Sequence, residues 1–248
     1  MSDLSKKVPP EPVSVIDDID ITELVENAPL FVDQAMQYQE LMMMYDCAIK
    51  EVRTKLEVLN SEFSVRYQRN PIEFISSRIK KPVSIARKLR KRGLPVNVAS
   101  MEENLADIAG VRVICSFIDD IYAIADMLTR QDDLRILERK DYIQSPKPNG
   151  YRSLHLILEV PVFFSDHKRP MKAEVQIRTI AMDFWASLEH QLKYKKAVPD
   201  EQEIIQELKE CADTIAATDQ RMLAIRNRIH NTAQSPEDPG AALQPLQN

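Results

Sequence analysis

Apolar residues recur every three to four positions along several stretches of the chain, which is the period of a helix with one buried face. Two of these stretches are long, one near each end of the sequence. A proline suits the first turn of a helix and a glycine its end, so these residues set further boundaries. Helices are therefore expected at 28–60, from Asn70-Pro71 onward, from Pro82 to about Lys91 with a stop at Gly93, at about 119–130, at 179–195 and at 200–230.

Between the helices the apolar period falls to two, which predicts strands with one apolar face. Such runs lie at 111–117, 154–160 and 173–177, and Leu134 to Leu137 is a candidate fourth strand. Strands and helices that alternate in this way predict a mixed α/β (α+β) fold, a sheet packed with helices and flanked by long terminal helices.

Polar residues alternate with the apolar ones in these strands, so they share the opposite face of the sheet. They are Tyr151, Ser153 and His155, then Glu174, Gln176 and Arg178, and finally Arg112. A merely solvated face usually carries Lys, Glu and Thr, without an aromatic residue beside a histidine. The pattern therefore favours a functional surface.

The composition of the chain excludes some kinds of nucleotide-binding and metal-binding site. Only four glycines occur, at 93, 110, 150 and 240, which excludes a P-loop and a GxGxxG turn, so side chains must hold any nucleotide. None of the four histidines pairs with cysteine at a metal-ligand spacing, which argues against structural zinc. No apolar run approaches the roughly 18 residues of a membrane span, and no export signal is recognisable, so we expect a cytoplasmic protein without membrane contact.

Charge is concentrated in one stretch. The net charge is −5, yet Arg78 to Arg92 holds eight basic residues and no acid, which leaves −13 on the rest of the chain. This distribution indicates a local site for a polyanion. On a helix from Pro82, the side chains of Ser84, Lys88 and Lys91 share one face. A solvated basic helix at 78–92 that contacts RNA is the alternative.

Two carboxylates are candidates for metal binding. Asp107 precedes the strand at 111–117 and is either a turn residue or, together with Glu174, a magnesium ligand. Glu174 is also a candidate general base for a ribose hydroxyl. The loop from Pro146 to Tyr151 has the Asn-Gly signature of a turn. It either only leads into a strand or places a tyrosine for stacking on a purine.

Four stretches, in this order, resemble the synthetase domain of RelA/SpoT-type proteins, and specifically the small alarmone synthetases. They are RNPIEF…SRIKKPVSIARKL, DIAGVRVICSF, DYIQSPKPNGYRSLHL and AEVQIRTIAMDFWASLEHQLKYK. The resemblance covers roughly 30–230, and the wording looks most like the RelP branch. It implies a nucleotidyltransferase-like mixed sheet of about five strands.

The resemblance also implies an activity, that of a GTP pyrophosphokinase. The 3′-hydroxyl of GDP or GTP would attack the β-phosphorus of ATP with the help of Mg²⁺, releasing AMP and forming the alarmone (p)ppGpp of the bacterial stringent response. The hydrolase and regulatory domains of the longer relatives are lacking, so we expect synthesis without degradation.

The matching motifs assign roles by position. Arg78 and Arg112 would sandwich adenine, and Lys80, Ser84, Lys88 and Lys91 would hold the ATP phosphates. Asp107 and Glu174 would bind Mg²⁺, with Glu174 also activating the hydroxyl. Tyr151 would stack on guanine, in a site lined by Lys140, Lys147, Asn149, His155 and Gln176. Asp183 stands where the RelQ-like branch has asparagine near the guanine, which leaves the preference between GDP and GTP open.

Composition at the two ends and the family resemblance together predict how the chain is organised. We expect a flexible N-terminus at 1–25, a synthetase domain at 26–200, a C-terminal helix for oligomerisation at 201–232 and a disordered tail at 233–248, assembled as a homotetramer. Two other functions stay open. One is the RNA-binding module on 78–92, and the other is transfer of a nucleoside monophosphate, which typically needs clustered carboxylates for two metals.

Overall fold

The computed structural model describes residues 21–193 and 201–234. The chain divides into two compact units, Met1–Leu41 and Met42–Asn248. The described part of the first unit is the beginning of helix α1 (Ile21–Tyr67). The sheet and the other helices belong to the second unit. Most of the expected flexible N-terminus (1–20) and of the expected disordered tail (235–248) lies outside the described residues.

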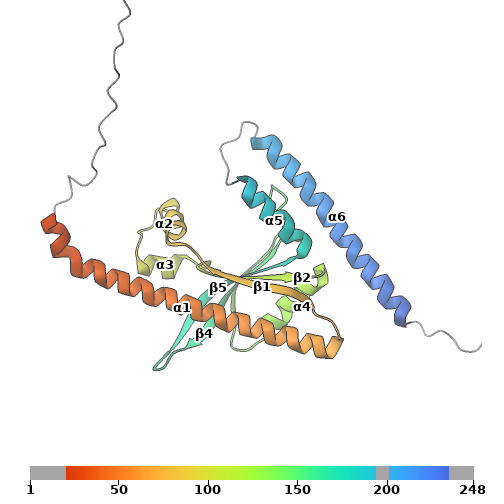
Figure 1. The fold of residues 1–248 in the computed structure, drawn as a ribbon, viewed down its shortest axis with the longest axis horizontal. Helices are drawn as coiled ribbons and strands as arrows, with labels where there is room; N and C mark the ends of the chain where they lie inside the picture. Colours follow the sequence, from red (N-terminus) through yellow and green to blue (C-terminus); the bar gives the residue numbers. More distant parts are fainter. Residues whose placement is uncertain (1–20, 194–200, 235–248) are drawn as a thin grey trace, which may run out of the picture. The chain divides into compact units, whose positions relative to one another are not determined.

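A five-stranded sheet forms the centre of the second unit (Figure 1). Its spatial order is β1-β2-β5-β4-β3, with β2 and β5 parallel and all other neighbours antiparallel. The expected mixed sheet is therefore confirmed. The strands are β1 (Ile72–Ile79), β2 (Ala109–Cys115), β3 (Arg135–Asp141), β4 (Leu154–Phe163) and β5 (Lys168–Thr179).

The helices follow the apolar periodicity closely. Besides α1 they are α2 (Pro82–Lys91), α3 (Val98–Asn104), α4 (Ile118–Thr129), α5 (Ile180–Lys193) and α6 (Glu201–Gln234). Gly93, with φ +69°, terminates α2 as expected, since only glycine adopts that backbone conformation without strain. None of the described helices combines the length and the apolar character needed to cross a bilayer.

The helix expected from Asn70-Pro71 is wrong, because this segment is strand β1. Its residues Ile72, Phe74 and Ile75 are β-branched or aromatic, and its backbone pairs with β2 from Ile72 to Ile79. A proline just before a strand costs no ladder hydrogen bond, so Pro71 suits either structure and the pairing decides. Consequently Arg78 lies on the sheet, and only 82–91 of the basic stretch is helical.

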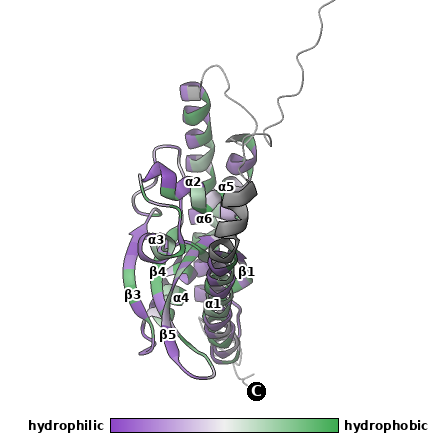
Figure 2. Cartoon of the chain, turned by 90° about the vertical axis from the view of Figure 1, so that its left-hand side faces the viewer, coloured by the Kyte–Doolittle hydropathy of each residue, from purple (hydrophilic) through white to green (hydrophobic). Residues whose placement is uncertain are grey.

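The apolar sheet face and the helices on it form the core. Alternate residues of β2, β4 and β5 are fully buried, and α4 packs against β2 and β5. The edge strand β3 carries both hydrophilic and hydrophobic residues and is exposed along most of its length (Figure 2). The buried stripe of α1 within the second unit consists of Met44, Tyr45, Ala48, Ile49, Val52, Leu56 and Leu59.

Helix α6 is tied to α5 and to the end of β5. Trp185 Nε1 donates to the Leu208 carbonyl at 2.9 Å, and the Thr179 hydroxyl donates to Asp219 at 2.6 Å. Thr179 Oγ1 also accepts from the Met182 backbone N–H, so the same hydroxyl caps the first turn of α5. These bonds fix α6 beside the end of the sheet that carries the polar loop.

Candidate active site

Strand register places the polar residues in rows on one face of the sheet. Across the five strands, Lys140 lies opposite His155, His155 opposite Gln176, Gln176 opposite Arg112 and Arg112 opposite Ser76. Residues in register point to the same side, so the expectation of a shared polar face is confirmed for these strands. Tyr151 and Ser153 lie just before β4 rather than on it.

A second row contains the candidate base. Glu174 on β5 lies beside Gly110 on β2, which lies opposite Arg78 on β1. Gly110 has no side chain, and only Arg78 atoms, at 3.6 and 3.7 Å, lie near the place where a Cβ would sit. The missing side chain opens a cleft between Glu174 and Arg78.

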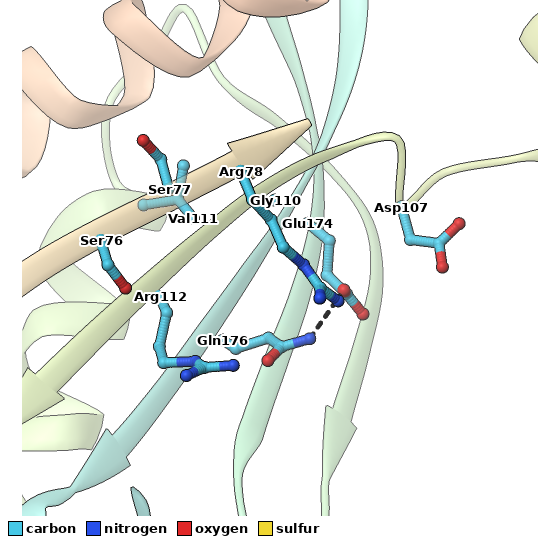
Figure 3. Close-up of a pocket in the computed structure, with 9 residues that line it drawn as sticks. All are labelled: Ser76, Ser77, Arg78, Asp107, Gly110, Val111, Arg112, Glu174 and Gln176. Atoms are coloured by element: carbon cyan, nitrogen blue, oxygen red, sulfur yellow. Dashed lines mark hydrogen bonds between the residues drawn. The ribbon is translucent and has the colours of Figure 1, made fainter. Parts of the chain in front are cut away.

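This cleft has a free volume of about 460 Å³, including the part open to solvent. Figure 3 shows the side chains of Arg78, Arg112 and Gln176 on the same side as the Glu174 carboxylate, with Asp107 at the end of the cleft. Its lining consists of Ser76, Ser77, Arg78, Asp107, Gly110, Val111, Arg112, Glu174 and Gln176. Of the sequence-derived candidates, the cleft thus brings together Arg78 and Arg112 of the expected ATP site, Gln176 of the expected acceptor site, and the two candidate magnesium ligands Asp107 and Glu174.

Asp107 joins this cleft to helix α2. Its Oδ2 accepts hydrogen bonds from Lys80 Nζ and Lys88 Nζ, each at 2.7 Å. Burial alone would raise the pKa of Asp107, but the hydrogen bonds and charges of the two lysines outweigh it and lower the pKa. Asp107 Oδ1 is buried and has no hydrogen-bond partner among the described residues. One carboxylate oxygen is thus bound by two ammonium groups, while the other is buried without a partner among the described residues.

Glu174 is held at both oxygens. His155 Nδ1 lies 3.1 Å from Oε1, and Gln176 Nε2 donates to Oε2 at 2.8 Å. Burial raises the pKa of Glu174, but the hydrogen bond and charge of His155 and the hydrogen bond from Gln176 more than offset this, so the pKa is lowered. The carboxylate is therefore ionised at neutral pH. The charge of Asp107 also acts on it, which places the two acids in one electrostatic site.

An aromatic group adjoins Glu174. The Tyr151 hydroxyl lies 2.8 Å from His155 Nε2, and the Tyr142 ring meets the His155 ring edge-on with centroids 5.2 Å apart. Lys147 Nζ lies 4.5 Å from the Tyr142 ring centre and 4.8 Å from that of Tyr151. A cation between two aromatic faces marks an electron-rich surface that suits a flat base. Tyr142 has no distinguishing pattern in the sequence and was not anticipated.

Two arginines share one carboxylate behind the cleft. Asp183 Oδ1 lies 3.1 Å from Arg178 Nη1 and 3.3 Å from Arg112 Nη1. Burial, and after it the charge of Arg178, lowers the pKa of Arg112. Arg112 Nε is buried without a partner among the described residues. Arg178 was expected on this face because of its alternation with Gln176, but no role was assigned to it.

Ten of the fifteen expected site residues do not line the cleft; six of them are described above, and the other four are Ser84, Lys91, Lys140 and Asn149. Lys91 is exposed in the last turn of α2, and Ser84 is half-buried on the same helix. Lys140 Nζ pairs with Glu138 at 2.7 Å, and Asn149 Nδ2 donates to Glu189 at 3.0 Å. Ser84 and Lys91 are on α2, Lys140 is on β3 and Asn149 is in the loop before β4, whereas the strands that line the cleft are β1, β2 and β5.

Comparison with known proteins shows to which family the chain belongs. The sequence profile described as "Region found in RelA / SpoT proteins" matches residues 77–198. The GTP pyrophosphokinase YwaC of Bacillus subtilis is 46% identical over 188 residues, which are 76% of this chain and 90% of that protein. The GTP pyrophosphokinase YjbM of the same organism is 32% identical over 193 residues, 78% of this chain and 90% of its own length.

Solved structures of similar proteins point to the same family. Small alarmone synthetase 2 of Bacillus subtilis superposes with a TM-score of 0.69 at 46% identity, covering 77% of this chain and 98% of that one. Small alarmone synthetase 1 of the same organism, bound to its product pppGpp, gives a TM-score of 0.71 at 32% identity and covers 79% of this chain and 99% of that one. The RelP branch stays a prediction. The chain belongs to the RelA/SpoT family, among its small alarmone synthetases.

Proposed function

We propose that this chain is a GTP pyrophosphokinase that transfers a pyrophosphoryl group from ATP to the 3′-hydroxyl of GDP or GTP. The observation that carries the proposal is that the lysine-bound Asp107 and the histidine-bound Glu174 line one cleft. Relatives named GTP pyrophosphokinases support it, as do structures of small alarmone synthetase 1 bound to pppGpp and to AMPCPP.

The donor nucleotide fits the α2 side of the cleft. Lys80 and Lys88 supply two ammonium groups beside Asp107, where ATP phosphates would add negative charge. Ser84 and Lys91 extend this row along α2. Arg78 and Arg112 lie on adjacent strands, and guanidinium planes of this kind stack on both faces of a base such as adenine.

Mg²⁺ fits the two carboxylates. Asp107 Oδ1 is buried without a partner among the described residues, and Glu174 is the second acid of the cleft. The described residues hold no cluster of three potential ligands from His, Cys, Asp and Glu. Two carboxylates suit Mg²⁺, which keeps several waters and binds substrate phosphates. When bound, the ion would neutralise phosphate charge at the reacting centre.

Glu174 would act as the general base. It takes the proton of the 3′-hydroxyl while that oxygen forms a bond to the β-phosphorus of ATP, and the bond from this phosphorus to the bridging α–β oxygen breaks to release AMP. His155 and Gln176 hold the two carboxylate oxygens and so aim the base. Tyr151 would stack on guanine, and Lys140, Lys147, Asn149 and Asp183 would border this acceptor site.

A transfer assay tests the proposal. The protein is incubated with γ-³²P-ATP, Mg²⁺ and GDP or GTP, and the products are separated by thin-layer chromatography. We expect labelled (p)ppGpp together with AMP. Glu174→Gln should bind AMPCPP normally and lose about 10²–10⁴-fold in turnover. The matched control is Glu159→Gln, which removes a β4 acid that pairs with Arg135 at 2.7 Å outside the cleft.

The outcomes separate the alternatives. Pyrophosphate instead of AMP as the by-product would indicate nucleoside monophosphate transfer. RNA binding that nucleotides do not displace and that weakens steeply with salt would favour the RNA-binding module. Wild-type turnover in Glu174→Gln would refute the assignment of the base.

We also propose assembly into a homotetramer through α5 and α6, the latter matching the expected oligomerisation helix at 201–232. A groove between these helices is lined mainly by apolar atoms, and large apolar side chains along it are exposed. Those that line the groove are Ile180, Phe184 and Met222, and Leu188, Ile225 and Ile229 are exposed elsewhere on the same two helices. Light scattering after size exclusion should give four chains for the wild type and fewer for Phe184→Asp.

A further inference from the structure

Arg178 is a buried arginine that bonds to several side chains at once. Its Nη2 donates to the Tyr151 hydroxyl at 2.6 Å and to Gln176 Oε1 at 2.9 Å. Its Nη1 donates to Asp183 at 3.1 Å, and its Nε to Ser153 Oγ at 3.4 Å. The side chain is only 5% exposed and does not line the cleft. It therefore acts on its neighbours rather than on a nucleotide.

One arm of this network leads to the first oxygen of Glu174. An ionised carboxylate can only accept, so His155 Nδ1 must carry the proton that bonds Glu174 Oε1. The other ring nitrogen, Nε2, is hydrogen-bonded to the Tyr151 hydroxyl at 2.8 Å, so the imidazole is held at both nitrogens. The same hydroxyl oxygen accepts from Arg178 Nη2, which links the histidine to the arginine.

The other arm leads to the second oxygen. Arg178 donates to Gln176 Oε1, so the amide must present its Nε2 to Glu174 Oε2, at 2.8 Å. The two arms close a ring that runs Arg178, Tyr151, His155, Glu174, Gln176 and back to Arg178. A guanidinium has a rigid planar fork, so one nitrogen sets the orientation of both arms.

We propose that Arg178 is a positioning residue for the transfer reaction, which orients both oxygens of Glu174 and holds the Tyr151 ring in place for the acceptor nucleotide. This inference rests on the proposed function. Asp183 binds the guanidinium at Nη1, and Arg112 has its own contact with Asp183, so we expect Arg112 to stay in place when Arg178 is replaced. The effect therefore falls on the acceptor and on the base, and little on ATP.

Two substitutions test the ring. Arg178→Lys keeps the charge, but a single ammonium on a shorter reach cannot reproduce the fork, and Tyr151→Phe keeps the stacking ring while removing the hydroxyl. For each we expect about a 10–100-fold loss in kcat and a rise in KM for GDP, with KM for ATP within about twofold. Direct GDP and AMPCPP binding by calorimetry should show the same split.

A double-mutant cycle distinguishes a positioning role of Arg178 from a general loss of stability. Because both changes break the same arm, Arg178→Lys with Tyr151→Phe should cost hardly more than Arg178→Lys alone. The matched control is Arg69→Lys, which alters another arginine bound to a buried carboxylate, Asp120, outside the cleft. It should lower the melting temperature and leave both KM values unchanged.

Three results would overturn the inference. They are a wild-type kcat and KM for GDP in Arg178→Lys, fully additive effects in the cycle, and equal rises in both KM values that track a lower melting temperature. If Arg178→Lys does not fold, Tyr151→Phe alone decides, since a variant with normal kinetics shows that the hydroxyl arm is idle. A wild-type protein that forms no alarmone refutes the proposed function instead, which keeps the two failures apart.

Discussion

Gly150 is the point at which the acceptor loop meets the C-terminal helix. Its φ is +87°, and a Cβ added there would lie 2.5 Å from Ala212 Cβ and 3.1 Å from Lys209 Cα on α6. Carbon atoms pack at about 3.5–4.0 Å, so Gly150→Ala would push α6 away by about 1 Å or shift the loop that carries Tyr151. Arg152 binds the same place, donating to the Gly150 and Ala212 carbonyls at 3.0 and 3.3 Å.

The loss in free energy of unfolding that we expect for Gly150→Ala has two contributions. A left-handed backbone costs alanine about 1–2 kcal/mol relative to glycine. The clash with Ala212 Cβ and the Lys209 backbone, which cannot move away by a side-chain rotation, adds about 1–3 kcal/mol. Gly93 supplies the matched control, because its φ is +69° and nothing lies within 4 Å of its added Cβ. We therefore expect Gly150→Ala to lose about 1–3 kcal/mol more than Gly93→Ala.

The assay is thermal unfolding at one protein concentration, read by circular dichroism and by the fluorescence of Trp185, the one tryptophan of the chain. For a chain of this size the extra loss corresponds to roughly 2–12 °C in Tm. Because Trp185 bonds to Leu208 on α6, its emission reports on the contact between α5 and α6. The KM for GDP should rise as well, since Tyr151 follows Gly150.

A second substitution checks the cause. Ala212→Gly removes the nearer atom, so the double variant should be less destabilised than the sum of the two single variants, although glycine in a helix costs about 1 kcal/mol by itself. If Gly150→Ala were no worse than Gly93→Ala, or if the two effects simply added, the close approach would not be the reason for glycine at this position.

Three further predictions concern charge. Burial raises the pKa of Asp219 more than its hydrogen bond from Thr179 lowers it. The folded chain therefore keeps a proton that the unfolded chain loses above about pH 4. Because the folded state binds more protons, the free energy of unfolding falls as the pH rises from about 4 through the raised pKa of Asp219. Asp219→Asn should therefore be more stable than wild type at pH 7, with the gain vanishing below about pH 4 in urea unfolding; a constant difference at all pH values would contradict this. Lys88→Gln removes one of the two ammonium groups on Asp107 and should raise the KM for ATP about 10-fold without changing that for GDP, which steady-state kinetics would show; an equal change in both would count against a donor-side role. Chelation of divalent ions should stop product formation reversibly while far-UV dichroism stays unchanged, and activity that persists in excess chelator would exclude a required Mg²⁺.

Local pattern alone predicts most residues of the candidate site. Side chains alternate along any strand, so the shared face of Glu174, Gln176 and Arg178 follows from their spacing whatever the partner strands are. Helix α2 was equally predictable, because Pro82 and Gly93 mark its ends within the local sequence. The expected positions of the terminal helices came from their apolar period, although their ends differ by several residues.

Long-range contacts decided those parts of the fold and of the candidate site that local pattern does not predict. Pro71 is compatible with a helix or a strand, and pairing with β2 made the segment β1, which brought Arg78 beside Gly110. Lys80, Lys88 and Asp107 meet although 27 and 19 residues separate the lysines from the acid. The ring through Arg178 likewise joins a loop to two strands, and Gly150 touches a helix about 60 residues away along the chain. Such contacts depend on how strands register and helices dock, which no short-range spacing encodes, because the backbone's local preferences fix side-chain direction but not which distant surface a side chain will meet.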